Sequence, residues 1–155
     1  MSNKLESTLE IIEELNEILA KCYDAEKGYK EAALALSNSS LKSMFQDYVK
    51  QRNEFGHQIK NEIIAMGGEV KTGGTLAGTL HRAWMDFRSS ITENDEAAIL
   101  KEAIRGENNA LENYQDAMED IPVTSSAYTT LVNQRNQIRS ALNRLERLVP
   151  VFDEA

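Results

Sequence analysis

Apolar residues recur along most of the chain at the three- and four-residue spacing that places them on one face of an α-helix. This pattern predicts four long helices, over about residues 3–36, 41–66, 95–120 and 126–149, and a shorter helix over about residues 75–91. Capping residues precede several of these stretches, and glycine or proline is expected to end them. The caps are expected within residues 37–40, 92–95 and 124–125, and the expected ends are at Gly67, Pro122 and Pro150.

The four long helices fall into two pairs, because short segments join the first to the second and the third to the fourth. Short connections between helices favour antiparallel hairpins. Residues 67–94 separate the pairs and are long enough to run from one end of a bundle to the other. We therefore predict a single all-α domain over residues 1–155. Its expected architecture is a ferritin-like four-helix bundle of two antiparallel hairpins, with a long crossover that contains a fifth, shorter helix.

Composition and charge exclude several classes of function. The net charge of −8 at pH 7 argues against nucleic acid and anionic membrane surfaces as partners. No apolar run approaches the ~18 residues that span a bilayer, and no signal peptide is expected from the first residues. Cys22 is the sole cysteine, which fits a reducing, cytoplasmic compartment. We expect it to be an inert core residue, with a reactive thiol as the alternative.

The tripeptide Gln-Arg-Asn occurs twice, at residues 51–53 and 134–136, in the second helix of each predicted hairpin. We read it as part of a degenerate internal duplication. Helical periodicity turns both arginines and two glutamates, one in the first helix of each hairpin, toward the bundle interior. Distance from each turn places Glu26 level with Arg52 and Glu107 level with Arg135. We predict these as core ion pairs; the alternative is that both arginines extend to the surface and pair with nothing.

Several segments resemble a known family. They are His81-Arg82-Ala83-Trp84-Met85-Asp86-Phe87, Ala98-Ile99-Leu100, Arg105-Gly106-Glu107 and Asp24-Ala25-Glu26-Lys27-Gly28-Tyr29. The chain is similar over nearly its whole length to bacterial ferritin-like four-helix-bundle proteins classed as a domain of unknown function. The resemblance implies the fold and kinship to ferritins and rubrerythrins, and it implies no particular activity.

A di-iron site of the ferritin kind would need carboxylates from four helices, with Glu-x-x-His pairs on some of them. Glu54 and His57 form one such pair, but helical geometry turns both away from the apolar stripe of their helix. Glu107 precedes Tyr114 by seven residues, as ferritin-like proteins commonly have it, but Cys22 stands at the matching position of the first helix. In the fourth long helix, Gln137 and Ser140 stand where a second pair would be.

We therefore expect no functional di-iron site, no metal ligands, no cofactor and no catalytic residues. The expected role is structural or interaction-based, with stress as one candidate setting, and the protein partner is undefined. The main alternative is an iron-binding protein or ferroxidase-like oxidase with a partial site. Its ligands would be Glu26, Glu54, His57, Glu107 and Gln137. A further alternative is a homo-oligomer that contacts itself through helix faces and builds a site between subunits from the outward Glu54 and His57.

Overall fold

The computed structural model describes residues 2–71, 85–89 and 95–153, and all regular secondary structure in this part of the chain is helical. The all-α prediction is confirmed. The long helices are α1 (Ser2–Ala35), α2 (Ser39–Ala65), α4 (Glu96–Glu119) and α5 (Ser126–Phe152). Their order and extent agree with those expected from the apolar periodicity.

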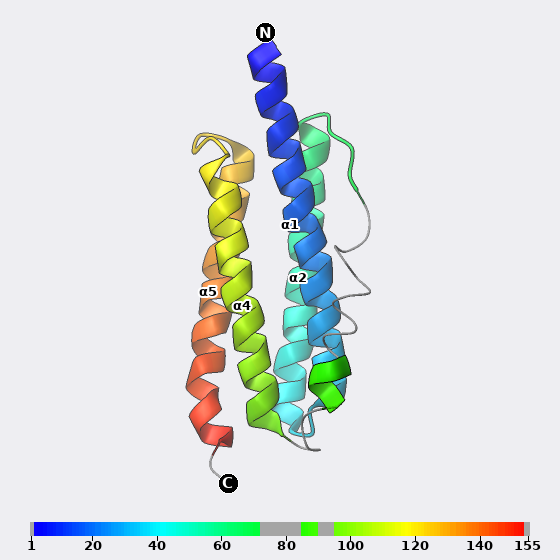
Figure 1. The fold of residues 1–155 in the computed structure, drawn as a ribbon, viewed down its shortest axis with the longest axis vertical. Helices are drawn as coiled ribbons and strands as arrows, with labels where there is room; N and C mark the ends of the chain where they lie inside the picture. The colour runs from blue at the N-terminus through cyan, green and yellow to red at the C-terminus, as the bar shows by residue number, and fades with distance from the viewer. Residues whose placement is uncertain (1, 72–84, 90–94, 154–155) are drawn as a thin grey trace.

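The helices form two antiparallel hairpins, α1 with α2 and α4 with α5, packed side by side (Figure 1). The C-terminus of α2 and the N-terminus of α4 lie at opposite ends of the bundle, so the connection between them crosses its length, as predicted. Residues 85–89 are helical, and Phe87 packs against the core near the α1–α2 turn. The rest of the predicted short helix, including His81 and Trp84, lies outside the described residues.

Side-chain caps begin three of the helices where the sequence predicts them. Asn38 accepts a hydrogen bond from the Leu41 N–H at 3.0 Å, and Asp95 accepts one from the Ala98 N–H at 3.0 Å. Ser125 accepts one from the Tyr128 N–H at 3.1 Å. Each bond satisfies an N–H that the first helical turn leaves without a partner.

The predicted end of α5 at Pro150 is wrong, because the helix includes this proline and continues to Phe152. A proline inside a helix removes its own N–H donor and crowds the carbonyl four residues earlier. That carbonyl belongs to Glu146, which is exposed, as is Pro150. Water can therefore bind the freed carbonyl, and the helix has only two residues left to run.

The core consists of two apolar clusters stacked along the bundle axis. One cluster lies at the end that holds the start of α1 and the α4–α5 turn, and it includes Leu15, Ile59 and Leu131. The other lies toward the α1–α2 turn and includes Phe45 and Leu100. Two charged side chains, Arg52 of α2 and Glu107 of α4, are also buried. In each helix the charged residue falls between the residues of one cluster and those of the other. The two form the centre of the site described below.

Contacts within each hairpin are far more extensive than contacts between the hairpins. Specific polar contacts join the two halves. The carboxylate of Glu96, in the first turn of α4, accepts hydrogen bonds from the backbone N–H groups of Ser37 and Asn38 at 3.0 and 3.1 Å. The carboxylate of Glu62, in α2, accepts from the hydroxyls of Ser126 and Thr130 at 2.7 and 3.0 Å.

The end of α2 depends on a glycine in the left-handed region. Gly67 has φ +77°, and its N–H donates to the Ile64 carbonyl. The Gly68 N–H donates to the Ile63 carbonyl. These two bonds make the Schellman arrangement that closes a helix and satisfies its last carbonyls.

We expect Gly67→Ala to lower the free energy of unfolding by about 1–2 kcal/mol, because a β-carbon is disfavoured at this φ. The matched control is Gly28→Ala inside α1, where an added β-carbon meets no other atom within 4 Å. That change should raise stability by roughly 0.5–1 kcal/mol. Urea denaturation followed by circular dichroism measures both, and equal effects of the two changes would contradict the assignment.

Candidate functional site

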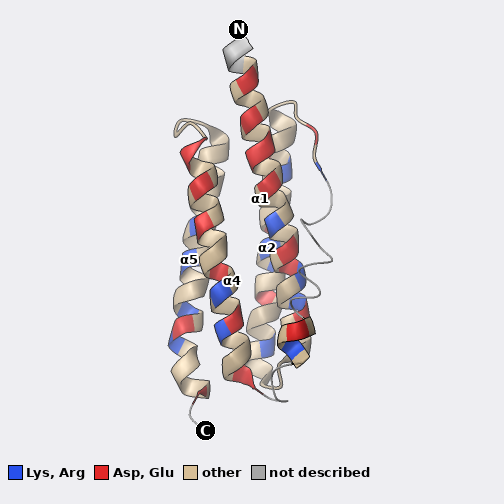
Figure 2. Cartoon of the chain, in the orientation of Figure 1, with Lys and Arg blue, Asp and Glu red and all other residues tan. Residues whose placement is uncertain are grey.

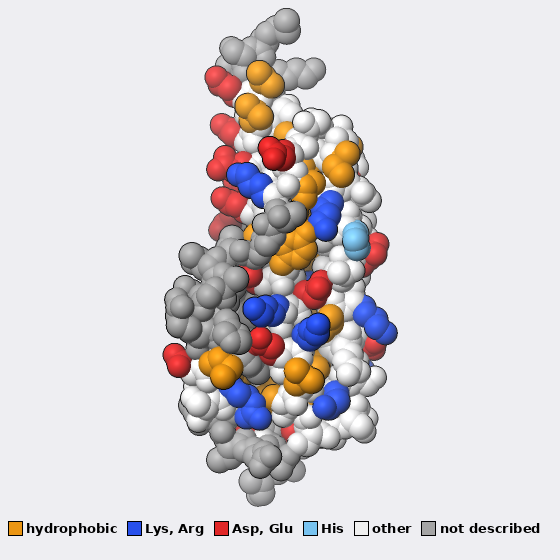
Figure 3. All heavy atoms as spheres, turned by 90° about the vertical axis from the view of Figure 1, so that its right-hand side faces the viewer, with side chains coloured by type: hydrophobic (Ala, Val, Ile, Leu, Met, Phe, Trp, Pro, Cys, Tyr) orange, Lys and Arg blue, Asp and Glu red, His pale blue; other side chains and the backbone are white. Residues whose placement is uncertain are grey.

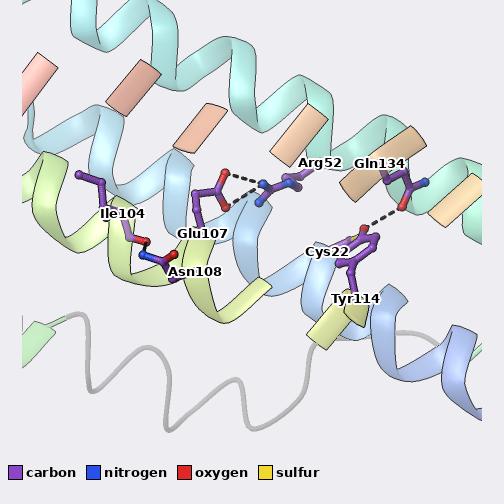
Figure 4. A network of polar contacts seen from close by, with 7 residues as sticks. All are labelled: Cys22, Arg52, Ile104, Glu107, Asn108, Tyr114 and Gln134. Atoms are coloured by element: carbon purple, nitrogen blue, oxygen red, sulfur yellow. Dashed lines mark hydrogen bonds and ion pairs between the residues drawn. The ribbon is translucent and has the colours of Figure 1, made fainter. Parts of the chain in front are cut away.

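An ion pair joins α2 to α4 through the middle of the bundle. Nη2 of Arg52 lies 2.7 Å from Oε1 and 2.6 Å from Oε2 of Glu107. These helices are diagonal neighbours, because α1 and α5 separate them around the bundle. Figure 4 shows both side chains extended toward each other across the interior. The predicted buried salt bridge is thus confirmed, although its partners come from different hairpins.

Both members of the pair are withdrawn from solvent, with 2% of the surface of each residue exposed. The guanidinium carbon of Arg52 lies 5.6 Å from the ring centre of Tyr29 and 5.7 Å from that of Phe55. Burial alone would lower the pKa of Arg52, but the charge of Glu107 raises it above its ordinary value. The two side chains therefore form an ion pair enclosed by an apolar environment.

A second polar network lies beside the ion pair and involves all four long helices. The Tyr114 hydroxyl, from α4, donates to Oε1 of Gln134, from α5, at 2.7 Å and lies 3.6 Å from the Cys22 sulfur, from α1. Nε2 of Gln134 donates to Oε1 of Gln58 and to the Phe55 carbonyl of α2. Figure 4 shows Tyr114 and Gln134 meeting next to Arg52. We call Cys22, Arg52, Glu107, Tyr114 and Gln134 the central polar layer.

Burial keeps the Cys22 thiol and the Tyr114 hydroxyl of this layer protonated. It raises the pKa of the Cys22 thiol to about 11, against the lowering effects of the hydrogen bond to Tyr114 and of Arg52. Burial, and then Cys22, raise the pKa of Tyr114 well above its ordinary value. At neutral pH the thiol therefore stays protonated. A protonated, buried thiol is a poor nucleophile, which supports the expectation of an inert Cys22.

The structure does not bring together the four residues predicted as core ion pairs. Glu107 binds Arg52 and not Arg135. Glu26 is only half-buried and accepts a hydrogen bond from Nδ2 of Asn53 at 3.1 Å. Arg135 is half-buried and contacts Oδ1 of Asn136 at 3.5 Å, while its Nε is buried without a hydrogen-bond partner. The predicted pairings of Glu26 with Arg52 and of Glu107 with Arg135 are therefore wrong.

One residue of this layer, Gln134, was not predicted. In α5 the buried stripe runs through Leu131, Gln134 and Ile138. In α2 the corresponding stripe runs through Arg52, so the two copies of Gln-Arg-Asn are turned by one residue, or about 100°, relative to each other. The four-residue spacing of Gln134 from Ile138 was the signal in the sequence that could have shown its inward position.

The residues of the alternative iron site are dispersed. Glu54, His57 and Gln137 are exposed, as the helical geometry predicts for the first two. His57 supplies the pale blue surface patch in Figure 3, since it is the sole histidine among the described residues. Across the described ranges, no three side chains of histidine, cysteine, aspartate or glutamate lie close enough to share a metal ion.

The interior also lacks the donors that a di-iron centre of this fold requires. Glu107 is the one carboxylate fully buried among the described helices, and both its oxygens bind Nη2 of Arg52. The other inward polar groups include the neutral Cys22 thiol, the Tyr114 hydroxyl and the Gln134 amide, and these three are already in contact with one another. These residues do not fit a ferritin-type metal site, which needs several carboxylates pointing at one position.

We expect Glu107→Leu to lower the free energy of unfolding by about 3–5 kcal/mol, because it leaves Arg52 charged and buried without a partner. The double change Glu107→Leu with Arg52→Met should cost much less, since no unpaired charge remains. Glu54→Leu is the control for the same substitution at an exposed position and should change stability by less than about 0.5 kcal/mol. A double variant as unstable as the single one in urea would contradict the pairing.

We also expect the protein to lose stability as the pH rises from about 9 to 11. Above pH 9.0, its ordinary pKa, the Cys22 thiol of the unfolded chain ionises, whereas the folded chain holds the proton to about pH 11. The unfolded state then binds fewer protons, so stability falls by roughly 1.4 kcal/mol per pH unit from this group. Cys22→Ala should flatten that slope in urea titrations at successive pH values. An unchanged slope in the Cys22→Ala variant would contradict the assignment of this pH dependence to Cys22.

Among the helices described, none has the length and apolarity needed to cross a membrane. Solved structures share the fold. A ferritin-like, diiron-carboxylate protein from Bacillus anthracis strain Ames is 21% identical, with a TM-score of 0.68 over 92% of this chain and 97% of its own. A dodecameric thioferritin, the bacterioferritin-related protein from Bacteroides fragilis, is 17% identical, with a TM-score of 0.64 over 94% of this chain and 84% of its own.

No curated protein matches the sequence. The family described as "Domain of unknown function (DUF2383)" matches residues 10–120, which is well over half of the chain. Together with the fold, this match confirms the resemblance to bacterial ferritin-like bundles of undefined function. The chain is a ferritin-like four-helix bundle and belongs to the DUF2383 family.

Proposed function

We propose that this protein is a ferritin-like bundle that works without a di-iron centre and serves a structural or interaction role. The observation that carries the proposal is the position of the Arg52 guanidinium, which binds both carboxylate oxygens of Glu107 in the bundle interior. Ferritin-like metal proteins use such inward carboxylates to hold cations. Here a side-chain cation takes that place.

The chemistry of arginine makes this replacement a stable one. A guanidinium is not deprotonated in proteins, and the neighbouring carboxylate raises the pKa of Arg52 further. A metal ion could reach Glu107 only by displacing the whole side chain. That displacement would leave a charged guanidinium in a layer bounded by apolar clusters, at a cost of several kcal/mol. Glu107 is thus unavailable as a ligand.

An interaction role is supported by the surface of the molecule. The first turns of α1 project beyond the other helices (Figure 1), and Leu5 and Leu9 there are 61% and 56% exposed. Acidic residues accompany them along this half of α1 (Figure 2). The exposed arginines of α5, which include Arg139 and Arg147, carry the opposite charge. We propose a second copy of the chain as the partner, since the related fold from Bacteroides fragilis is dodecameric.

Nucleic acid is not a proposed partner, because a net charge of −8 opposes binding to its phosphates. A reducing, cytoplasmic setting suits the buried, free Cys22, and stress is one physiological context to examine. Glu54 and His57, although exposed, would gain a metal-binding role only if a second subunit supplied further ligands beside them.

Iron loading of the purified protein tests the proposal. After anaerobic incubation with Fe²⁺ and desalting, elemental analysis should find far less than one iron per chain. Addition of oxygen to an Fe²⁺ mixture should produce Fe³⁺ no faster than buffer does. The matched variant is Glu107→Gln with Arg52→Gln, which removes both charges and keeps hydrogen-bonding groups. It should behave as the wild-type protein does.

The opposite result would be near-stoichiometric iron with oxidase activity, both lost in that variant. It would establish the alternative iron-binding function and overturn the proposal. Iron that binds the wild type but disappears in His57→Ala and stays in the double variant would place the site on the exposed face of α2. That result would also contradict a metal-independent role.

A further inference from the structure

The first turns of α1 extend beyond the neighbouring helices with an apolar side that the rest of the bundle leaves uncovered (Figure 1). Leu5 and Leu9 lie one turn apart on this side and are both exposed. Ile11 and Leu15 point the other way and are buried in the core. Short helical segments without a packing partner are marginal in water. Adjacent exposed leucines on such a segment therefore favour a contact with another molecule.

A row of glutamates runs beside these leucines. It consists of four exposed residues spaced by three or four positions, which places them on one side of α1: Glu6, Glu10, Glu13 and Glu17. Residues 5–17 contain no lysine or arginine, and none of the four glutamates forms an ion pair with another described residue. Like charges at this spacing destabilise a helix. A cationic surface against the row would offset that repulsion.

The second half of α5 has the complementary composition. This helix contains four arginines and one acidic residue, Glu146. Arg139, Arg144 and Arg147 are exposed. Val151, one turn after Arg147, is 65% exposed. Figure 2 shows the contrast between the red positions along the first half of α1 and the blue positions on α5. The end of α5 thus offers both positive charge and an exposed apolar side chain.

The spacings on the two helices match in an antiparallel alignment. Twelve positions separate Leu5 from Glu17 in α1. Twelve also separate Arg139 from Val151 in α5, which is roughly 18 Å along either helix. An antiparallel alignment pairs Leu5 with Val151 at one end. It pairs Glu17 with Arg139 at the other, and the remaining glutamates and arginines lie between. A parallel alignment would place each apolar end against charged residues.

The two surfaces cannot meet within one molecule. α1 and α5 are diagonal helices, because α2 and α4 separate them around the bundle, and their exposed faces therefore point away from each other. A symmetric contact between two α1 helices is disfavoured, since their acidic rows would repel. Each molecule must then offer α1 to one neighbour and α5 to another. Such a heterologous contact builds rings or chains.

We propose that the first half of α1 docks, antiparallel, on the second half of α5 of another copy of this chain. The inference rests on the interaction role proposed for the bundle and specifies the interface through which that role is exercised. Exposed ion pairs contribute little affinity each. The charges therefore orient the contact, the leucines and Val151 supply its apolar part, and the association is weak, concentration-dependent and sensitive to salt.

Sedimentation velocity of the full-length protein tests this interface. In low salt, the average mass should rise above the 17.4 kDa of one chain as the concentration increases, and high salt should reverse the rise because it screens exposed charges. Glu10→Arg with Glu17→Arg should raise the concentration needed for half-association by about 10-fold or more, since like charges then face each other. Arg139→Glu with Arg147→Glu should have the same effect. An equimolar mixture of the two variants should associate again, because each reversed surface meets a surface of opposite charge.

Asp47→Arg with Glu54→Arg is the matched control, because it makes the same change in net charge as the α1 variant on an exposed face of α2. It should associate as the wild type does, and circular dichroism verifies that each variant is folded. A mixture that stays dissociated would overturn the proposal. Association that neither pair of reversals weakens would overturn this docking and leave the interaction role standing. A wild type that keeps the mass of one chain in low salt would overturn both this docking and the second copy as partner. Iron uptake is measured separately, so these results do not depend on the metal-independent role.

Discussion

The buried ion pair between Arg52 and Glu107 is the contact on which the arrangement of the two hairpins depends. Each hairpin is held together by long helix–helix contacts, whereas fewer contacts hold one hairpin against the other. Apolar faces tolerate sliding and rotation, but a guanidinium and a carboxylate 2.6–2.7 Å apart do not. Because an unpaired buried charge is so costly, the pair disfavours other registers between the hairpins.

The hydrogen-bond network around Tyr114 and Gln134 further restricts how the helices pack. Hydrogen bonds connect Tyr114 of α4 to Gln134 of α5 and Gln134 to α2, while Cys22 of α1 contacts the Tyr114 hydroxyl. The polar layer therefore touches every long helix, between an apolar cluster on either side. Buried polar groups that find partners in one arrangement favour that arrangement, although the Arg52 Nε is buried without a hydrogen-bond partner here. The layer thus supplies specificity, while the apolar clusters supply most of the favourable free energy of folding.

The fold could be predicted from the sequence because its determinants are local: apolar periodicity, caps such as Asn38 and Asp95, and short turns. The partner of Glu107 could not be predicted from the sequence. Distance from a turn gives a residue's height in its own hairpin, and by height Arg135 and Glu107 agreed. Which side chains meet across the bundle also depends on rotation about each helix axis. A difference of one residue, about 100°, places Gln134 inward in α5 and turns Arg135 aside.

The same ion pair determines the charge of the bundle interior. A lone buried glutamate would be neutral or would attract a cation. Once Arg52 binds both oxygens of Glu107, the two fully buried charges of the described helices cancel each other. A single arginine therefore cancels the charge with which an inward carboxylate would otherwise attract a cation.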